Sequence, residues 1–367
     1  MTADLSGLHG ELRTAARDLL GRPGLDAGRV AEAGWFGLEV PEALDGAGAG
    51  FAETAIVIEE MGRAAARTPY LGAVLAVEAL NLLEPGPGRD RLLRETASGA
   101  VLPVLALSGE LPGGLAGGFA GGLAGGRDGA CGFRMERSPD GPLLHGRAAF
   151  VPDAPEAGRL LLPALDLDGV PVLLDAAPGA AGLGVTAQPV LDETRRLGAV
   201  TADGAVAGDE SVRRFGGDPG AALRRLADRA AFAIACDSLG LSEAMLDATV
   251  AYAGVRHQFG RPIGSFQAVK HACADMLVEI SVARRLVAAA VRALAAGDPG
   301  AGVAASMAKS YTSAAAVGVT GRAMQLHGGM GYTWESGVHV HLKRAALNRS
   351  LFGSPSSHRR RIADRYQ

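Results

Sequence analysis

Hydrophobic periodicity changes its character twice along this chain of 367 residues. Residues 3–95 carry apolar side chains at the spacing of amphipathic helices, whereas residues 101–213 show short apolar runs broken by Gly, Pro and Asp. Helical spacing returns after Gly217 over long stretches, at residues 221–255, 266–296, 301–326 and 338–351. We therefore expect an α+β multidomain fold: an N-terminal helical domain (1–100), a middle β-barrel-like domain (101–213) and a C-terminal four-helix bundle (214–367).

Charge and hydropathy argue against several classes of function. The chain has 36 Lys and Arg against 39 Asp and Glu, so its net charge of -3 gives no general attraction to nucleic acid. No apolar run reaches the roughly 18 residues that a membrane span needs, and the N-terminus lacks the apolar core of a secretion signal. The three cysteines lie far apart and form no metal-binding pair. We expect a soluble, cytoplasmic protein without a membrane span or a metal site.

The first motif with chemical content joins two of the long helical stretches and reads YAGVRHQFGRPIGSFQAVKHACADM, residues 252–276. Arg256 stands at the end of the first helix, Phe259 offers an aromatic face, and Gln267 opens the next helix. A guanidinium binds phosphate oxygens in pairs and a helix N-terminus favours anions, so this junction suits an anionic, planar ligand. The alternative is that Arg256 only satisfies the carbonyl groups at the end of its helix.

A second motif, QLHGGMGYTWE at residues 325–335, follows the third long helical stretch. Gly328, Gly329 and Gly331 let a ligand approach the backbone closely and expose N–H groups to it. Gln325 precedes them by one helical turn. His327 is interpreted as a packing residue, because a single His beside glycines more often packs or donates a hydrogen bond than catalyses.

These two motifs resemble those of the acyl-CoA dehydrogenase family. R-x-x-F-G-x-P-I-x-x-F-Q-x-x-K-H-x-x-A-D-M and Q-x-H-G-G-x-G-Y-T-x-E both match, and GWFGLEVPEALDGAGAG at residues 34–50 is similar to the family's N-terminal signature. With the helical, β, helical order, the resemblance covers essentially the whole chain and implies the acyl-CoA dehydrogenase fold.

The resemblance implies FAD as the cofactor and an acyl-CoA or other acyl thioester as the substrate. In the family, the α hydrogen leaves as a proton to a carboxylate, the β hydrogen leaves as a hydride to the flavin, and an electron-transfer flavoprotein accepts the electrons. Residues at the matching positions contact the FAD held by a neighbouring subunit, so oligomerisation belongs to cofactor binding. Those positions here are Arg256, Phe259, Gln267, Gln325, Gly328 and Gly329.

The carboxylate that the family uses as its base is missing from both places where members carry it. The common position, a Glu in a Tyr-Glu-Gly-Thr setting, corresponds to Gly353, and the rarer position on the helix before the motif Arg corresponds to Ala230. Asp228 lies two residues before Ala230, but two residues turn a helix by about 200°, so its side chain faces elsewhere. The catalytic base of this chain is therefore unknown, and Asp228 is kept as its one nearby candidate.

The β domain also departs from the family's flavin-binding segments. LALSGELPGG keeps only Ser108 as a hydroxyl donor, and the Trp that covers the flavin in the family is Phe150, with Pro152 in place of a hydroxyl residue. Residues 113–126 read GGLAGGFAGGLAGG and favour a tolerated surface insertion over a mobile loop near the pocket.

Three functions stay open on the sequence. The first is an FAD-dependent acyl-thioester dehydrogenase subunit, as a homomer or as one half of a heteromeric dimer or tetramer whose family paralogue supplies the base. The second is a non-catalytic homologue that binds an acyl thioester or stabilises an assembly. The third is a flavin monooxygenase on the same fold, which needs no base for an α proton.

Overall fold

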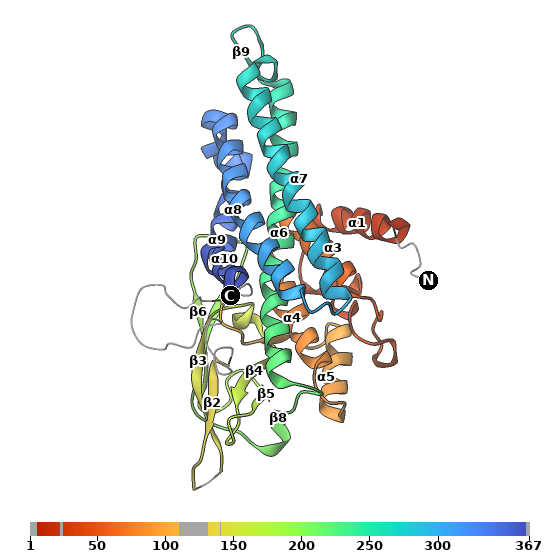
Figure 1. Cartoon of the computed structure of the whole chain (residues 1–367), viewed down its shortest axis with the longest axis vertical. Helices are drawn as coiled ribbons and strands as arrows, with labels where there is room; N and C mark the ends of the chain where they lie inside the picture. The colour runs from red at the N-terminus through yellow and green to blue at the C-terminus, as the bar shows by residue number, and fades with distance from the viewer. Residues whose placement is uncertain (1–5, 23–24, 110–130, 140, 365–367) are drawn as a thin grey trace.

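The computed structural model describes residues 6–22, 25–109, 131–139 and 141–364. A helical segment, a β segment and a second helical segment follow one another, which confirms the expected order (Figure 1). The Gly-rich run at 113–126 lies outside the described residues, so its interpretation stays a prediction. The domain borders after residues 100 and 213 also stay predictions, with a helix that ends at Ala97 and a strand that begins at Pro103 on either side of the first.

The N-terminal segment is built from short helices, of which α3 and α4 pack against the long helix α6. Its α-helices are α1 (Ser6–Leu20), α2 (Ala27–Glu32), α3 (Phe51–Arg63), α4 (Tyr70–Asn81) and α5 (Pro87–Ala97), with 3-10 turns η1 (Trp35–Gly37) and η2 (Glu42–Leu44). Helix α4 is apolar on all sides and buried along nearly its whole length, because α6 and strand β1 both lie against it.

The middle segment is a mixed sheet with the strand order β6-β7-β3-β2-β4-β5-β8, and β1 pairs with β4. Its strands are β1 (Pro103–Leu105), β2 (Phe133–Glu136), β3 (Leu143–Pro152), β4 (Arg159–Leu165), β5 (Pro171–Ala176), β6 (Leu183–Gln188), β7 (Leu197–Val206) and β8 (Val212–Arg213). Two 3-10 turns, η3 (Ala154–Glu156) and η4 (Asp209–Ser211), connect strands.

Strands β4 and β5 are apolar on both faces, and the structure explains why. Leu161 and Leu173 point into the core shared with the helices, whereas Leu160, Leu162 and Leu174 point into the separate core of the β segment. Successive side chains of a strand face opposite sides, so a strand between two cores is apolar throughout. The unbroken runs RLLLPAL and VPVLLDA are therefore strands buried on both faces.

The C-terminal segment is a bundle of long helices whose first two form a projecting hairpin. Its helices are α6 (Pro219–Val255), α7 (Gln267–Ala295), α8 (Ala301–His327), α9 (Val338–Ser350) and α10 (Pro355–Ala363). The turn between α6 and α7 holds the two-residue strands β9 (His257–Gln258) and β10 (Arg261–Pro262) and the turn η5 (Ile263–Ser265), and η6 (Gly328–Tyr332) and η7 (Trp334–Ser336) precede α9. The 37 residues of α6 span about 55 Å, so the hairpin tip lies at the opposite end of the molecule from the sheet (Figure 1). Within the described ranges, no helix has the length and apolar character needed to cross a bilayer.

A buried ion cluster joins all three segments. Asp237 on α6 accepts hydrogen bonds from Arg344 Nε and Nη2 on α9, at 3.0 and 2.5 Å, and lies 3.0 Å from Arg195 Nη2 on the β6–β7 connection. Arg344 Nη1 also donates to the carbonyl of Ala66, between α3 and α4. Asn348 Nδ2 donates to the Asp237 carboxylate at 2.6 Å. One carboxylate therefore holds two guanidinium groups and ties the helical segments to the β segment.

We predict that Asp237→Asn destabilises the fold by about 3–5 kcal/mol, because it leaves the guanidinium groups of Arg344 and Arg195 buried without their counter-charge. Denaturant unfolding at pH 7 measures this. The matched control is Asp247→Asn at the exposed pair with Arg63, where a loss of only about 0–1 kcal/mol is expected. Equal losses of unfolding free energy in the two variants would show that the buried cluster contributes no more stability than an exposed ion pair.

The same cluster predicts acid sensitivity. Burial by itself would raise the pKa of Asp237, but the charges of Arg344 and Arg195 outweigh burial and hold the pKa well below its usual range. The stabilisation is therefore fully present above the unfolded pKa of about 4 and is lost as the pH falls below it. The free energy of unfolding of the wild type should decline below about pH 4 more steeply than that of Asp237→Asn.

Candidate functional site

The tip of the α6–α7 hairpin presents the residues of the first motif to solvent. Helix α6 ends at Val255, and Arg256 closes it, with its N–H donating to Tyr252 and its carbonyl accepting from Ile263 N. Phe259 has φ 54° and is 91% exposed, since it sits at the turn between β9 and β10. Gln267, also exposed, is the first residue of α7. Among the described residues, no side chain pairs with the guanidinium of Arg256.

The glycine motif lies at the end of α8, beside this tip. Gln325, Gly328 and Gly329 are exposed, and Gly328 ends the helix with φ 59°. His327 stacks on Tyr252 of α6, with ring centroids 4.5 Å apart and an interplanar angle of 19°. His327 is buried, and its Nδ1 lies 2.7 Å from the Ala323 carbonyl. This stack brings the two motifs together and supports the interpretation of His327 as a packing residue.

The loop at Gly353, which the resemblance matches to the family's base position, lies in the interior, far from the tip. Leu351 to Gly353 follow α9, and all three residues are buried. Phe352 N donates to Gly109 O at 3.2 Å, and Gly353 N donates to Ser350 O at 3.2 Å. Gly353 O accepts from Lys309 Nζ at 2.6 Å, and Phe352 O lies 3.0 Å from His358 Nε2. All four backbone polar groups of Phe352 and Gly353 thus have partners within the chain.

Lys309 and His358 were missed by the sequence analysis, because neither belongs to the motifs and their contacts join distant segments. Lys309 on α8 is fully buried and donates to the carbonyls of Asn348 and Gly353, and burial lowers its pKa to about 7. His358 on α10 is buried, and burial lowers its pKa to about 4. The imidazole is therefore neutral at physiological pH. Nε2 carries its proton, since its partner there is the Phe352 carbonyl, and Nδ1 accepts from Ser306 Oγ at 3.2 Å.

The second family position for the base is equally empty of acid. Ala230 is completely buried in α6. Asp228 lies 2.5 Å from Arg361 Nη2 on α10, and its Oδ2 faces Gly302 at the start of α8. Burial raises the pKa of Asp228, against the opposing effect of Arg361. In this arrangement the carboxylate serves a contact among α6, α8 and α10, and its role as a base stays a prediction.

The base position and the tip lie near different points of helix α8, so the distance between them can be taken along its axis. Lys309, which holds Gly353, stands 18 residues before His327, and at 1.5 Å per residue this is about 27 Å. The tip residues and the base position of one chain therefore do not meet at one reacting atom.

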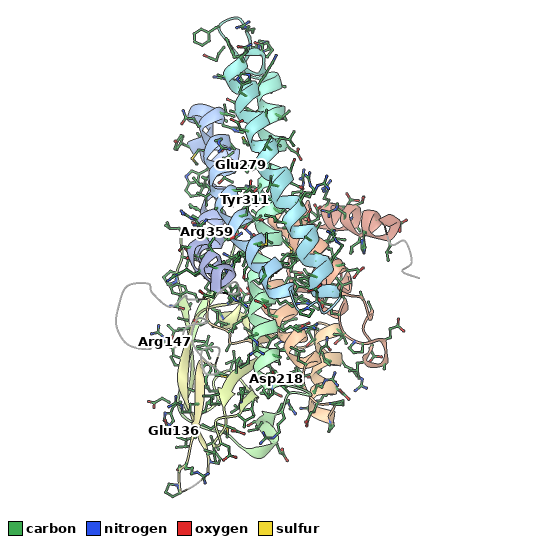
Figure 2. All side chains as sticks on the ribbon, in the orientation of Figure 1. Glu136, Arg147, Asp218, Glu279, Tyr311 and Arg359 are labelled. Carbon is green, nitrogen blue, oxygen red and sulfur yellow. The ribbon has the colours of Figure 1, made fainter. Side chains whose placement is uncertain are left out.

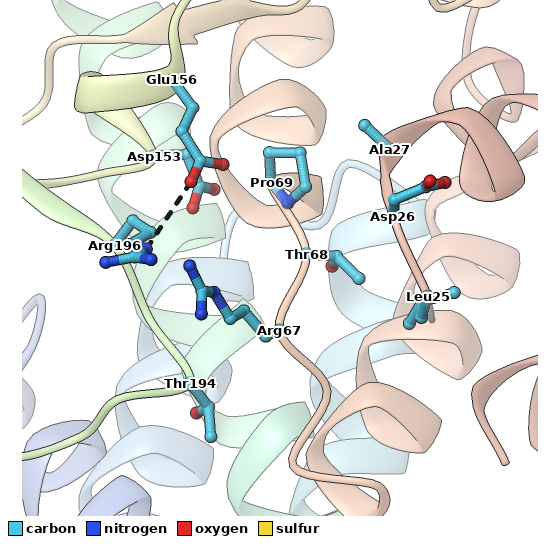
Figure 3. A pocket seen from close by; sticks show the side chains of 10 residues that line it. All are labelled: Leu25, Asp26, Ala27, Arg67, Thr68, Pro69, Asp153, Glu156, Thr194 and Arg196. Atoms are coloured by element: carbon cyan, nitrogen blue, oxygen red, sulfur yellow. Dashed lines mark ion pairs between the residues drawn. The ribbon is translucent and has the colours of Figure 1, made fainter. Parts of the chain in front are cut away.

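A separate cavity of about 360 Å³ opens between the N-terminal helices and the β segment (Figure 3). The ion pair of Arg196 with Glu156, 3.6 Å long, lies across it, and Asp153 lies in its wall. Burial raises the pKa of Asp153 to about 7, while its Oδ2 accepts from Gly72 N at 2.8 Å. None of the residues predicted as site residues lines this cavity.

Comparisons with known proteins agree with the class that the helical, β, helical fold and the tip define. The profile described as "Acyl-CoA dehydrogenase, C-terminal domain" matches residues 221–367, and "Acyl-CoA dehydrogenase, N-terminal domain" matches residues 23–99. The chain is 34% identical to acyl-CoA dehydrogenase IpdE2 of Mycobacterium tuberculosis, over 90% of this chain and 83% of that protein. It is 31% identical to IpdE2 of Mycolicibacterium smegmatis, over 90% and 84%.

Two solved structures extend the likeness to the whole fold. The Tcur3481-Tcur3483 steroid ACAD G363A variant matches with a TM-score of 0.82 and 28% identity over 98% of both chains. The ChsE4-ChsE5 complex from Mycobacterium tuberculosis matches with a TM-score of 0.80 and 25% identity, over 100% of this chain and 98% of that one. This chain belongs to the acyl-CoA dehydrogenase family. It is a flavoprotein oxidoreductase of lipid metabolism by that membership, and FAD is the cofactor of the family.

The described residues fit the two parts of an FAD site unequally. The exposed guanidinium, aromatic ring and bare backbone of the tip suit a dinucleotide. In the β segment, Ser108 Oγ is already bonded to the backbone of Ala149, and a methyl group on Gly109 would come within 2.5 Å of both Leu351 Cδ1 and Phe150 O. The tip therefore fits a dinucleotide better than Ser108 fits a flavin.

We predict that Lys309→Met destabilises the chain by roughly 2–5 kcal/mol, because it leaves the buried carbonyls of Asn348 and Gly353 without a donor. The pH dependence identifies the cause. The folded pKa of about 7 lies below the unfolded value, so from about pH 7 upward only the unfolded chain keeps the proton and stability rises with pH. Denaturant unfolding from pH 6 to 10 should show this rise in the wild type and in the exposed control Lys270→Met, and Lys309→Met should lack it.

Proposed function

We propose that this chain is the base-lacking subunit of a heteromeric, FAD-dependent acyl-CoA dehydrogenase. The observation that carries the proposal is the contrast between two places in one chain. The position of the base, Gly353, is buried and fully hydrogen bonded, whereas the cofactor-binding tip at Arg256 and Phe259 is exposed and unoccupied by any described part of the chain. A subunit of this kind completes a cofactor site in a partner and performs no proton abstraction of its own.

The tip supplies the binding function. Arg256 would pair with phosphate oxygens, Phe259 would lie against a flat ring, and the backbone N–H groups near Gly328 and Gly329 would reach the sugar or phosphate. Helix α6 is about 55 Å long and carries this tip to the end of the molecule opposite the chain's own sheet. The FAD that the tip binds would therefore belong to a neighbouring subunit. Gln267 and Gln325 add amide groups on the same side.

The reaction would be α,β-desaturation of an acyl-CoA thioester. FAD, when bound, accepts the β hydrogen as a hydride, and a carboxylate of the partner subunit takes the α proton. This chain holds the cofactor and helps to keep water out of the shared site. An electron-transfer flavoprotein would then reoxidise the flavin. The ChsE4-ChsE5 complex, which this chain resembles, consists of two different proteins and supports a paralogue as the partner.

An apolar surface on the bundle supports assembly. Side chains exposed by half or more lie on α6, α7 and the turns after α8: Val250 53%, Leu277 50%, Val278 62%, Tyr332 69% and Trp334 74%. An apolar cavity of about 290 Å³ lies beside the tip, between the end of α6 and the start of α7. A partner subunit that packs on the bundle would cover these side chains. We assign this surface to a family paralogue that carries the missing Glu.

A second candidate is a subunit that stabilises an assembly without touching FAD. The buried ion cluster of Arg229 with Glu39 and Glu78, with the guanidinium 3.9 Å from the centre of the Phe51 ring, favours it, because charged groups fill the space between α6 and the N-terminal helices. Such a space is poorly suited to an acyl chain. The two candidates differ in one measurable property, which is whether Arg256 affects the flavin content of the complex.

We expect the chain purified alone to be colourless and the complex with a Glu-bearing paralogue to be yellow. Flavin per heteromer should fall at least several-fold in Arg256→Ala, because the guanidinium is lost from the phosphates. Flavin release and absorbance measure this, together with sedimentation to confirm that the complex still forms. The control is Arg137→Ala in the exposed β2–β3 turn beside Glu136, at the far end of the molecule (Figure 2).

Each outcome decides between the candidates. An unchanged flavin content in Arg256→Ala, in a complex that still assembles, excludes the proposed role of the tip and favours the purely structural subunit. Full dehydrogenase activity of the chain alone, with its own FAD, contradicts the heteromer. A loss of flavin that Arg137→Ala reproduces would point to general damage and would also count against a specific role of the tip.

A further inference from the structure

A second residue, His358, occupies the space into which a side chain at position 353 would extend. A Cβ built on Gly353 would lie 2.0 Å from His358 Nε2, 2.6 Å from Cδ2 and 3.0 Å from Cε1. Contacts below about 3 Å do not occur between such atoms, so the imidazole of His358 occupies the place of any side chain at position 353. The backbone adds a further obstacle, because Gly353 has φ 123°, which residues with a side chain rarely adopt.

His358 is held in that place from several sides. Its Nε2 donates to Phe352 O, its Nδ1 accepts from Ser306 Oγ, and Lys309 anchors the neighbouring Gly353 carbonyl. The partners of this ring and of the neighbouring carbonyl come from α8 and from the loop itself. A ring with both nitrogens engaged and 5% exposure has little freedom to move aside for a new side chain.

We propose that His358 is a plug, in the sense that its imidazole fills the space that a side chain at position 353, the family's base position, would need. The inference rests on the proposed function, in which this subunit lacks the base. It implies that Gly353→Glu alone does not restore a carboxylate facing a substrate. His358 acts as a positioning residue for the 352–353 loop and takes no part in chemistry.

A double-mutant cycle tests the plug. Gly353→Ala should lower the melting temperature strongly, by roughly 5 °C or more, because its methyl group meets the imidazole. His358→Ala alone should lower it less, through two lost hydrogen bonds. In the Gly353→Ala background, however, His358→Ala should raise the melting temperature, since it removes the clash. A further lowering by the same amount as in the wild type would overturn the proposal.

Gly141→Ala is the matched control. Gly141 has φ 114°, close to that of Gly353, but a methyl group there would have no atom within 4 Å. It therefore carries the backbone strain without the collision. His358→Ala should lower the melting temperature in this background as it does in the wild type.

A second measurement covers the case in which Gly353→Ala does not fold. His358→Gly leaves a hole of the shape of an imidazole, so added imidazole should raise the melting temperature of this variant and leave that of the wild type unchanged. In Gly353→Ala/His358→Gly the methyl group takes the hole, and the rescue should vanish. Imidazole without effect on His358→Gly would contradict a fitted plug.

These measurements use the full chain and need neither FAD nor a partner. If the double-mutant cycle shows no clash but Arg256→Ala lowers the flavin content, the proposed function stands and only the role of His358 is excluded. A positive cycle with an unchanged flavin content in Arg256→Ala would keep the plug and exclude the role of the tip.

Discussion

The carboxylate of Asp237 is the interaction on which the rest of this structure depends. It lies in the middle of α6, and the guanidinium groups of Arg344 and Arg195 reach it from α9 and from the β segment. Two like charges tolerate burial side by side only with a counter-charge between them. Asn348 extends the cluster, because its side chain binds Asp237 and its carbonyl accepts from Lys309. Through Lys309 the same network reaches Gly353, so the joint between the three segments also fixes the loop at the base position.

This arrangement separates two properties that an enzyme of the family combines. The loop at Gly353 is part of the interior, and each of its backbone polar groups has a partner. The tip of α6 and α7 belongs to the surface, where the β9–β10 pairing and the Tyr252–His327 stack hold it. The two regions share helix α8 but lie about 27 Å apart along it. A change in the loop therefore leaves the geometry of the tip intact. Under the proposed function, the loop lacks the base while the tip still binds the cofactor.

The sequence predicted the order of helical and β segments, because periodicity depends on local burial alone. The long helices begin and end close to the expected residues, and the structure brings the two motifs together through the Tyr252–His327 stack. Lys309 and His358 could not be found in this way. A Lys within AASMAKSYT and a His within SSHRR carry no pattern of their own. Their significance comes from contacts across the sequence: Lys309 bonds to Gly353, 44 positions away, and His358 bonds to Phe352, 6 positions away (353 minus 309; 358 minus 352). The single signal was the Gly at 353, which showed a loss without showing what fills the space.

The residues around Gly353 leave neither an open space for a side chain nor an unpaired backbone carbonyl at the loop. An empty space beside Gly353 and a Phe352 carbonyl without a donor would each cost on the order of 1–3 kcal/mol. An imidazole placed there supplies both volume and a donor, since its Nε2–H reaches Phe352 O. Because burial keeps the pKa of His358 near 4, the ring repairs the interior without bringing a second positive charge next to Lys309. A neutral, hydrogen-bonding ring suits this place better than an aliphatic side chain, which offers no donor. It also suits the place better than an arginine, whose buried charge would need a carboxylate partner, while the carboxylate of Asp228 is already paired with Arg361.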